Sequence, residues 1–119
     1  MSGLENLTGL TLIACQANFI QDLQGLHTLV NLEELYLQQN QIKSFEGLEN
    51  NLKLETLDLA VNKIEVFEHL THLSSTLKEL WLNWNKFEDT EANKEYLKTF
   101  KVLETLYLAD NPLANKDNY

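Results

Sequence analysis

Residues 32–42 read Leu32-Glu-Glu-Leu35-Tyr-Leu37-Gln-Gln-Asn40-Gln-Ile42, a stretch with the pattern L-x-x-L-x-L-x-x-N-x-I. The same pattern recurs along the chain, and its copies begin at Leu10, Leu32, Leu54, Leu77 and Leu103. The asparagines of the copies are at positions 18, 40, 62, 85 and 111, so that successive asparagines are 22, 22, 23 and 26 residues apart. Self-similarity at a nearly fixed period of this length predicts a repeat architecture.

The physical chemistry of the pattern predicts the shape of each repeat. Alternation along a strand turns the two leucines of the L-x-L core inward and the residue between them outward. The asparagine amide offers donors and an acceptor, which can satisfy the backbone groups of a sharp buried turn. One copy is too small to bury its own apolar side chains, so the copies must stack and share one core. This is the leucine-rich-repeat signature, and it predicts an α/β solenoid of horseshoe shape.

We expect one leucine-rich-repeat domain over residues 1–119, with about five repeats. Its five parallel strands should line the concave face and be centred on residues 13–15, 35–37, 57–59, 80–82 and 106–108. After each turn the chain returns through segments such as 25–32, where leucines three residues apart predict short helical or 3₁₀ segments on the convex face.

Two of these back segments differ in length. The segment before Leu77 has one extra residue, which we place at 74–76. The stretch 89–100 is longer still, and we expect an α-helix within it. Thr90 followed by Glu91 is typical of a helix start, and an apolar face would come from Tyr96, Leu97 and Phe100.

The charge of the chain limits its partners. Eighteen acidic against nine basic residues give a net charge of −9, which repels nucleic acid and anionic membranes and favours a partner with a basic patch. The single Cys15 occupies an inward leucine position, so we expect a packed thiol. Because no disulfide can form within the chain, a reducing intracellular compartment is expected. No apolar run approaches the roughly 20 residues of a membrane span.

The two ends of the repeat array lack complete caps. Terminal repeats of solenoids normally carry a polar cap over the last layer of the core. Here the sequence begins inside a repeat, and nine residues follow Asp110. We therefore expect either a fragment of a longer protein or ends that another chain covers, including self-association through the uncapped repeat ends.

The sequence offers no constellation for catalysis. His69 and His72 are close in sequence but have no cysteine beside them, so we expect solvated imidazoles rather than a metal pair. Ser74 and Ser75 have no base near them in the pattern. We therefore expect neither an enzyme nor a cofactor or metal site.

The concave face is the surface on which we expect function. The outward residue of each L-x-L core is Ala14, Tyr36, Asp58, Trp81 or Tyr107. The outward residues two places earlier include Glu34 and Glu79. Aromatic side chains supply many hot spots of protein interfaces, and flanking carboxylates attract a basic partner. The predicted partner-binding residues are therefore Glu34, Tyr36, Asp58, Glu79, Trp81 and Tyr107.

Several segments of the chain resemble the leucine-rich-repeat regulatory subunits of protein phosphatase 1 (the regulatory subunit 7 family). These are the runs that begin at Asn31, Glu46, Lys78 and Leu103, together with the regular 22-residue repeat. The resemblance implies a C-terminal half of such a subunit, which binds the phosphatase catalytic subunit on its concave face in nucleus and cytoplasm. In that family the positions that match Asp58, Glu79, Trp81 and Tyr107 contact the phosphatase.

Two other interpretations keep the fold and change the partner. The ending from Asn111 to Tyr119 also resembles the start of the cap in other intracellular repeat proteins, of splicing-type and ciliary dynein-associated complexes. An adaptor of the splicing type binds RNA with its protein partner, which the charge of −9 disfavours. The third interpretation is a self-assembling scaffold, in which a second copy of the chain would cover the concave face.

Overall fold

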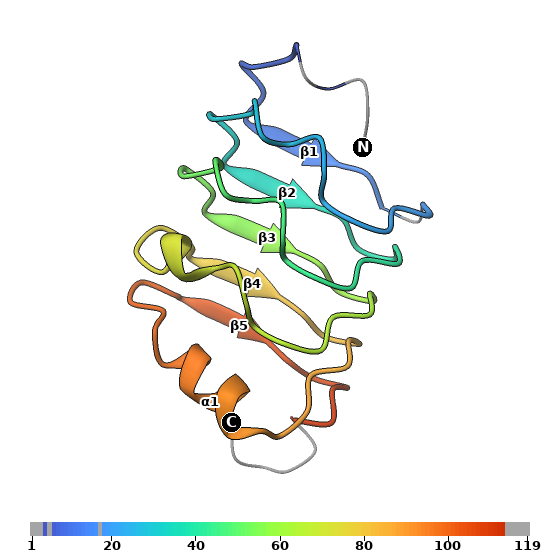
Figure 1. Cartoon of the computed structure of the whole chain (residues 1–119), viewed down its shortest axis with the longest axis vertical. Coiled ribbons are helices and arrows are strands. Elements are labelled where there is room, and N and C mark those ends of the chain that lie inside the picture. The colour runs from blue at the N-terminus through green and yellow to red at the C-terminus, as the bar shows by residue number, and fades with distance from the viewer. Residues whose placement is uncertain (1–3, 5, 17, 114–119) are drawn as a thin grey trace.

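The five strands of the chain form one parallel sheet (Figure 1). The computed structural model describes residues 4, 6–16 and 18–113. The strands lie in the order of the sequence, and they are β1 (Leu12–Ala14), β2 (Glu34–Tyr36), β3 (Thr56–Asp58), β4 (Glu79–Trp81) and β5 (Thr105–Tyr107). In Figure 1 the connecting segments all return on the same side of this sheet. The leucine-rich-repeat solenoid predicted from the sequence is confirmed.

The register of the sheet places equivalent residues of successive repeats side by side. The central residues Ile13, Leu35, Leu57, Leu80 and Leu106 are paired in this order across the sheet. Leu35 and Leu37 are both fully buried, so the inward direction of the L-x-L leucines is confirmed as well. Because every step of the sheet is in register, each outward position becomes a column of side chains.

The strands begin and end one residue earlier than predicted. Each is centred on the first leucine of its L-x-L core, for example on Leu35 in β2. The second leucine still joins the ladder, since the Leu37 N–H donates to the Asp58 carbonyl (2.8 Å). Directly after it the chain enters the asparagine turn, which shortens the regular part of the strand.

The marker asparagines connect neighbouring repeats. Asn62 Oδ1 accepts the N–H of Ile42 in the preceding repeat (3.0 Å), and Nδ2 donates to the carbonyls of Leu37 (3.1 Å) and Leu59 (3.0 Å). Three further asparagines make the equivalent bonds: Asn40, Asn85 and Asn111. Each amide thus satisfies backbone groups that the buried turn would otherwise leave without partners.

The back segments turn with the predicted period of three. The Leu29 N–H donates to the Leu26 carbonyl (3.0 Å), and the next repeats continue this series of bonds between residues i and i−3. One 3₁₀-helix is assigned within the described part of the chain, at Thr71–Leu73. It is followed by a wider turn in which the N–H of Leu77 reaches back to Leu73 (2.9 Å). This wider turn accommodates the extra residue at 74–76, as predicted.

The predicted helix is present as α1 (Glu91–Leu97). Its N-cap is Thr90, whose Oγ1 accepts the N–H of Asn93 (3.2 Å). Tyr96, Leu97 and Phe100 are only partly buried against the core. The residue that fixes the helix was missed from sequence: Asn93 is 2% exposed, accepts the Phe67 N–H (3.2 Å) and donates to two carbonyls.

A stack of aromatic rings completes the core behind the sheet. The ring centroids of Phe67 and Phe87 are 4.2 Å apart, and those of Phe45 and Tyr96 lie 6.3 Å from Phe67. The Cα trace measures 43 × 29 × 19 Å, in keeping with a short, flat solenoid. The C-terminal segment that was compared with the start of a cap lies outside the described residues from position 114 onward.

Candidate protein-binding face

The concave face of the sheet brings all six predicted residues together. Tyr36, Asp58, Trp81 and Tyr107 are successive neighbours across β2 to β5, because the register pairs each with the next. Glu34 and Glu79 flank Thr56 in the adjacent column. We call this set of six residues the acidic–aromatic face. None of the outward positions of the five strands carries Lys, Arg or His.

Tyr36 is held in place on one side of this face. Its hydroxyl donates a hydrogen bond to Glu34 Oε1 (2.7 Å). This bond and burial, together with the nearby carboxylates of Glu34, Glu79 and Asp58, raise the pKa of Tyr36 to about 12. The tyrosine therefore stays neutral at physiological pH, and its raised pKa reflects the negative potential of the surrounding carboxylates.

Trp81 and Tyr107 form the other side of the face. Their ring centroids are 4.3 Å apart, with a tilt of 39° between the planes. Trp81 is half-buried, whereas Tyr107 is 46% exposed. The sequence predicted three exposed aromatic residues, and this is corrected for Tyr36 and Trp81: each is partly covered by the neighbour that holds it. Such contacts limit the number of rotamers that the rings can adopt.

Asp58 requires the largest correction to the sequence-based picture. It was expected to be an exposed carboxylate, but only 9% of the residue is exposed. It lies between Tyr36 and Trp81 in the register, and these large side chains shield it. Its Oδ1 accepts the N–H of Ala60 (3.1 Å). Burial raises the pKa of the Asp58 carboxyl, and the hydrogen bond from Ala60 opposes this shift only in part.

Three further residues of the concave face, Gln38, Ala60 and Asn83, were not among the predicted site residues. Ala60 is 8% exposed, and its neighbours in the adjoining repeats are Gln38 and Asn83. Gln38 Oε1 and Asn83 Oδ1 are buried and accept no hydrogen bond from the described residues. The signal was present in the sequence, because these three residues occupy the third outward column, but nothing in the pattern indicates their burial.

No group of three or more His, Cys, Asp or Glu side chains that could hold a metal ion occurs among the described residues. The expected solvated state of His72 is corrected in part, since its Nε2 is hydrogen-bonded to the Leu48 carbonyl (2.7 Å) and therefore carries the proton. No described helix is long and apolar enough to span a membrane.

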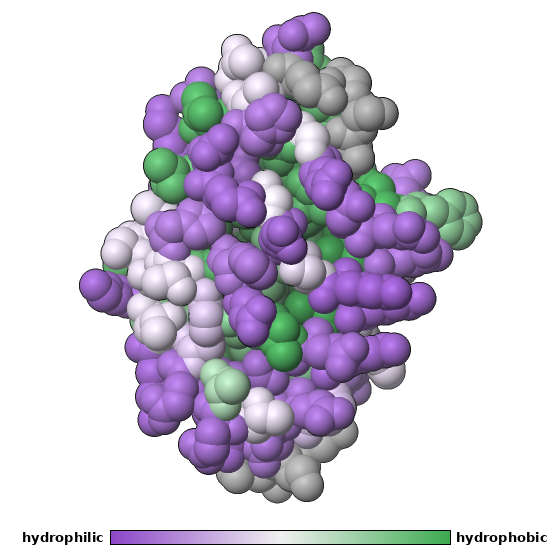
Figure 2. Space-filling view, in the orientation of Figure 1, coloured by the Kyte–Doolittle hydropathy of each residue, from purple (hydrophilic) through white to green (hydrophobic). Residues whose placement is uncertain are grey.

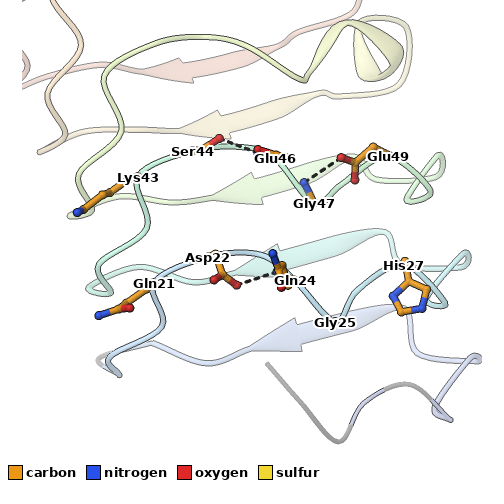
Figure 3. A pocket seen from close by; sticks show the side chains of 10 residues that line it. All are labelled: Gln21, Asp22, Gln24, Gly25, His27, Lys43, Ser44, Glu46, Gly47 and Glu49. Atoms are coloured by element: carbon orange, nitrogen blue, oxygen red, sulfur yellow. Dashed lines mark hydrogen bonds between the residues drawn. The ribbon is translucent and has the colours of Figure 1, made fainter.

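The back of the solenoid contains a hollow of about 490 Å³ between two neighbouring back segments, 21–27 and 43–49 (Figure 3). Two of its polar side chains are already used locally: Asp22 Oδ1 accepts the N–H of Gln24, and Ser44 Oγ accepts the N–H of Glu46. The face of the molecule seen in Figure 2, which keeps the orientation of Figure 1, is mostly hydrophilic, with hydrophobic side chains visible along its middle. We therefore place the candidate site on the sheet and not in this hollow.

Comparisons with known proteins agree with the fold. A family model described as "Leucine Rich repeats (2 copies)" matches residues 5–50. The crystal structure of an internalin (inlF) from Listeria monocytogenes str. 4b F2365 is similar over 91% of this chain and 31% of that one, with a TM-score of 0.83 and 30% identity. Internalin C2 (inlC2) of the same strain is similar over 92% of this chain and 58% of that one, with a TM-score of 0.59 and 24% identity.

The chain thus spans less than two thirds of the length of either internalin. No match was found among curated proteins. Together with the repeat pattern and the parallel sheet, these findings establish leucine-rich repeats with internalin-like structural neighbours. Domains of this class are generally protein–protein interaction modules.

Proposed function

We propose that this chain is a non-catalytic regulatory subunit whose acidic–aromatic face binds the catalytic subunit of protein phosphatase 1. The observation that carries the proposal is the burial of Asp58. No cation among the described residues pairs with this carboxylate. A buried charge without a partner lowers the stability of a folded chain, and a cation from a binding partner would remove that penalty.

The aromatic side chains support a protein partner. Trp81 lies in the fourth of five strands and is held by Tyr107. Large rings that are already fixed lose little conformational entropy on binding, and buried tryptophans are among the commonest hot spots of protein interfaces. Trp81 is therefore the proposed anchor, with Tyr36 and Tyr107 beside it.

The charge distribution supports a basic partner. The whole chain carries a net charge of −9, and basic side chains are absent from the outward positions of its strands. Such a field accelerates encounter with a positively charged surface and disfavours nucleic acid. The phosphatase catalytic subunit is named as this partner from the sequence resemblance alone, which also carries the proposed location in nucleus and cytoplasm. The chain would act by occupying a surface of the phosphatase.

The experiment that tests this function compares two tryptophans. The affinity of the purified phosphatase catalytic subunit is measured by calorimetric titration for the parent chain, Trp81→Ala and Trp84→Ala. Both variants remove an indole, but Trp84 is 58% exposed and lies on the turn after β4, outside the acidic–aromatic face.

We expect Trp81→Ala to weaken binding about thirtyfold, the effect of losing ~2 kcal/mol at a hot spot. Trp84→Ala should change the affinity by less than about threefold, as is usual for an exposed residue outside an interface. The proposal is wrong if the parent chain does not bind the phosphatase, or if the two variants weaken binding equally.

A further inference from the structure

We infer that Asp58 forms the base of a slot that receives one arginine side chain of the partner, with Tyr36 and Trp81 as its walls. This inference rests on the proposed function, and it specifies the chemical group that the acidic–aromatic face recognises. The slot is defined by three neighbouring strands, β2, β3 and β4.

The spacing of the walls fits a flat cation. Tyr36 and Trp81 are two strand steps apart, with Asp58 between them in the register. Two steps of a sheet are about 9–10 Å. A planar group between two rings needs about 3.5 Å on each side, or about 7 Å in all. The strand spacing therefore leaves room for a guanidinium group between the two residues, where its positive charge would face the π-electrons of the rings.

The walls are already fixed in the free chain. Tyr36 is held through the hydrogen bond from its hydroxyl to Glu34, and Trp81 is held by the ring of Tyr107. Binding sites with pre-organised walls lose less free energy on ordering than flexible ones. The hydrogen bond to Tyr36 also holds the Glu34 carboxylate beside this wall, so that the approaching side chain meets a negative field.

The base of the slot presents a carboxylate that lacks a cationic partner. Asp58 accepts one hydrogen bond from the described residues, that from Ala60, and it has no cationic partner. Arginine offers five N–H donors in a planar fork and is weakly hydrated, whereas lysine offers three donors on a compact, strongly hydrated ammonium. A carboxylate accepts two parallel hydrogen bonds from such a fork, so the carboxylate of Asp58 and the flat walls both favour arginine.

The sequence excludes a second copy of this chain as the source of the arginine. All nine basic residues of the chain are lysines. Self-association of these 119 residues cannot fill an arginine slot, so its occupant lies outside them. This requirement separates the slot from the interpretation in which copies of the chain cover the concave face of one another.

The test uses short peptides and the two tryptophans of the chain. Acetylated and amidated glycine–arginine–glycine is titrated at low salt into the ¹⁵N-labelled chain, and the indole N–H signals of Trp81 and Trp84 are followed by NMR. Peptides with lysine or with citrulline in place of arginine serve as controls. Citrulline keeps the shape of the side chain and removes its charge.

We expect the arginine peptide to shift the Trp81 signal saturably and to leave Trp84 unchanged. The lysine peptide should bind about fivefold more weakly or worse, because it cannot stack as a plane. Asp58→Asn should weaken arginine binding about tenfold or more, as expected for loss of a charge-assisted hydrogen bond. Glu46→Gln removes the same charge from an exposed residue of the back segment 43–49, outside the acidic–aromatic face, and should weaken it by less than about threefold.

Equal affinity for arginine and lysine overturns the slot, and so does an equal effect of Asp58→Asn and Glu46→Gln. The phosphatase titration separates this failure from that of the proposed function. If the phosphatase binds in a Trp81-dependent manner and the arginine peptide does not bind, the slot is wrong and the proposed function stands. If the peptide binds with the expected preferences and the phosphatase does not, the slot is supported and the named partner is wrong.

Discussion

Replacing Asn62 by alanine should destabilise the fold much more than the same change at Asn18. Asn62 Oδ1 is the acceptor for the Ile42 N–H in the preceding repeat (3.0 Å). Without it, this buried N–H has no partner. The carbonyl groups that Asn62 also contacts are less affected: the Leu37 carbonyl still accepts from Asn40 (2.9 Å), and the Leu59 carbonyl from Asn85 (2.9 Å).

The magnitude follows from this count. One orphaned buried N–H costs about 1–3 kcal/mol, and the lost donor bonds add a smaller amount, so that we expect about 2–4 kcal/mol for Asn62→Ala. Asn18 is exposed, and its Nδ2 donates to the carbonyls of Cys15 (3.2 Å) and Gln16 (3.0 Å). Water can replace these bonds, so Asn18→Ala should cost about 1 kcal/mol or less.

The assay is urea unfolding of the parent chain and both variants, followed by circular dichroism. The two substitutions should differ by about 2 kcal/mol, which for a chain of this length corresponds to roughly 8 °C in melting temperature. If both variants lose the same stability, the asparagine amide is not the link between neighbouring repeats. The same holds if Asn62→Ala is as stable as the parent chain.

Three further substitutions test the packing and the turns by thermal and urea unfolding. Leu80→Ala empties a fully buried position of the central column and should cost about 2–5 kcal/mol; a cost below that of an exposed residue would contradict the assigned core. Gly47→Ala should cost about 1–3 kcal/mol of stability, because the φ of Gly47 is +119° and the new Cβ would lie 2.8 Å from the Leu23 carbonyl oxygen. Unchanged stability would rule out this close approach. Val61→Asn should add about 1 kcal/mol, since Val61 is β-branched at φ 57° and asparagine tolerates that region better. Val66→Asn, at a similarly exposed valine, is its control and should not stabilise.

The spacing of the repeats was sufficient to predict the sheet. Leucines at a fixed distance from a marker asparagine determine which side chains turn inward, and the recurrence of the same pattern in each repeat determines the register. The strand limits were displaced by one residue, because the pattern does not indicate where the asparagine turn interrupts the ladder. Asn93 was missed for a similar reason. Its amide replaces backbone partners between the third and fourth repeats, and it lies in a longer repeat outside the common pattern.

The residues of the acidic–aromatic face could be predicted from the sequence, but the burial of each residue could not. The pattern assigns Asp58 and Tyr107 to the same outward column and treats them alike. In the structure Asp58 is 9% exposed and Tyr107 46% exposed, because Asp58 has a large aromatic neighbour on each side. Burial of an outward side chain depends on the size and rotamers of its neighbours across the sheet, and alternation along one strand contains no information about them.

The central claim is that the buried charge of Asp58 lowers the stability of the free chain and serves binding. Burial raises the pKa of this carboxyl in the folded chain above its ordinary value of 3.8. At pH 7 the group is ionised in both the folded and the unfolded chain, so the full penalty is present. As the pH falls through the raised folded-state pKa toward 3.8, the folded chain takes up the proton first and the penalty disappears.

The most direct test is to measure stability and phosphatase affinity for Asp58→Asn in the same preparation. Asparagine keeps an oxygen that can accept the Ala60 N–H and removes the charge. We predict that the variant is more stable than the parent chain at pH 7, by about 0.5–2 kcal/mol. This gain in stability should shrink as the pH falls toward 3.8. The variant should also bind the phosphatase catalytic subunit about tenfold more weakly. A variant that is less stable than the parent chain at pH 7, or that is more stable but binds with unchanged affinity, would contradict the account.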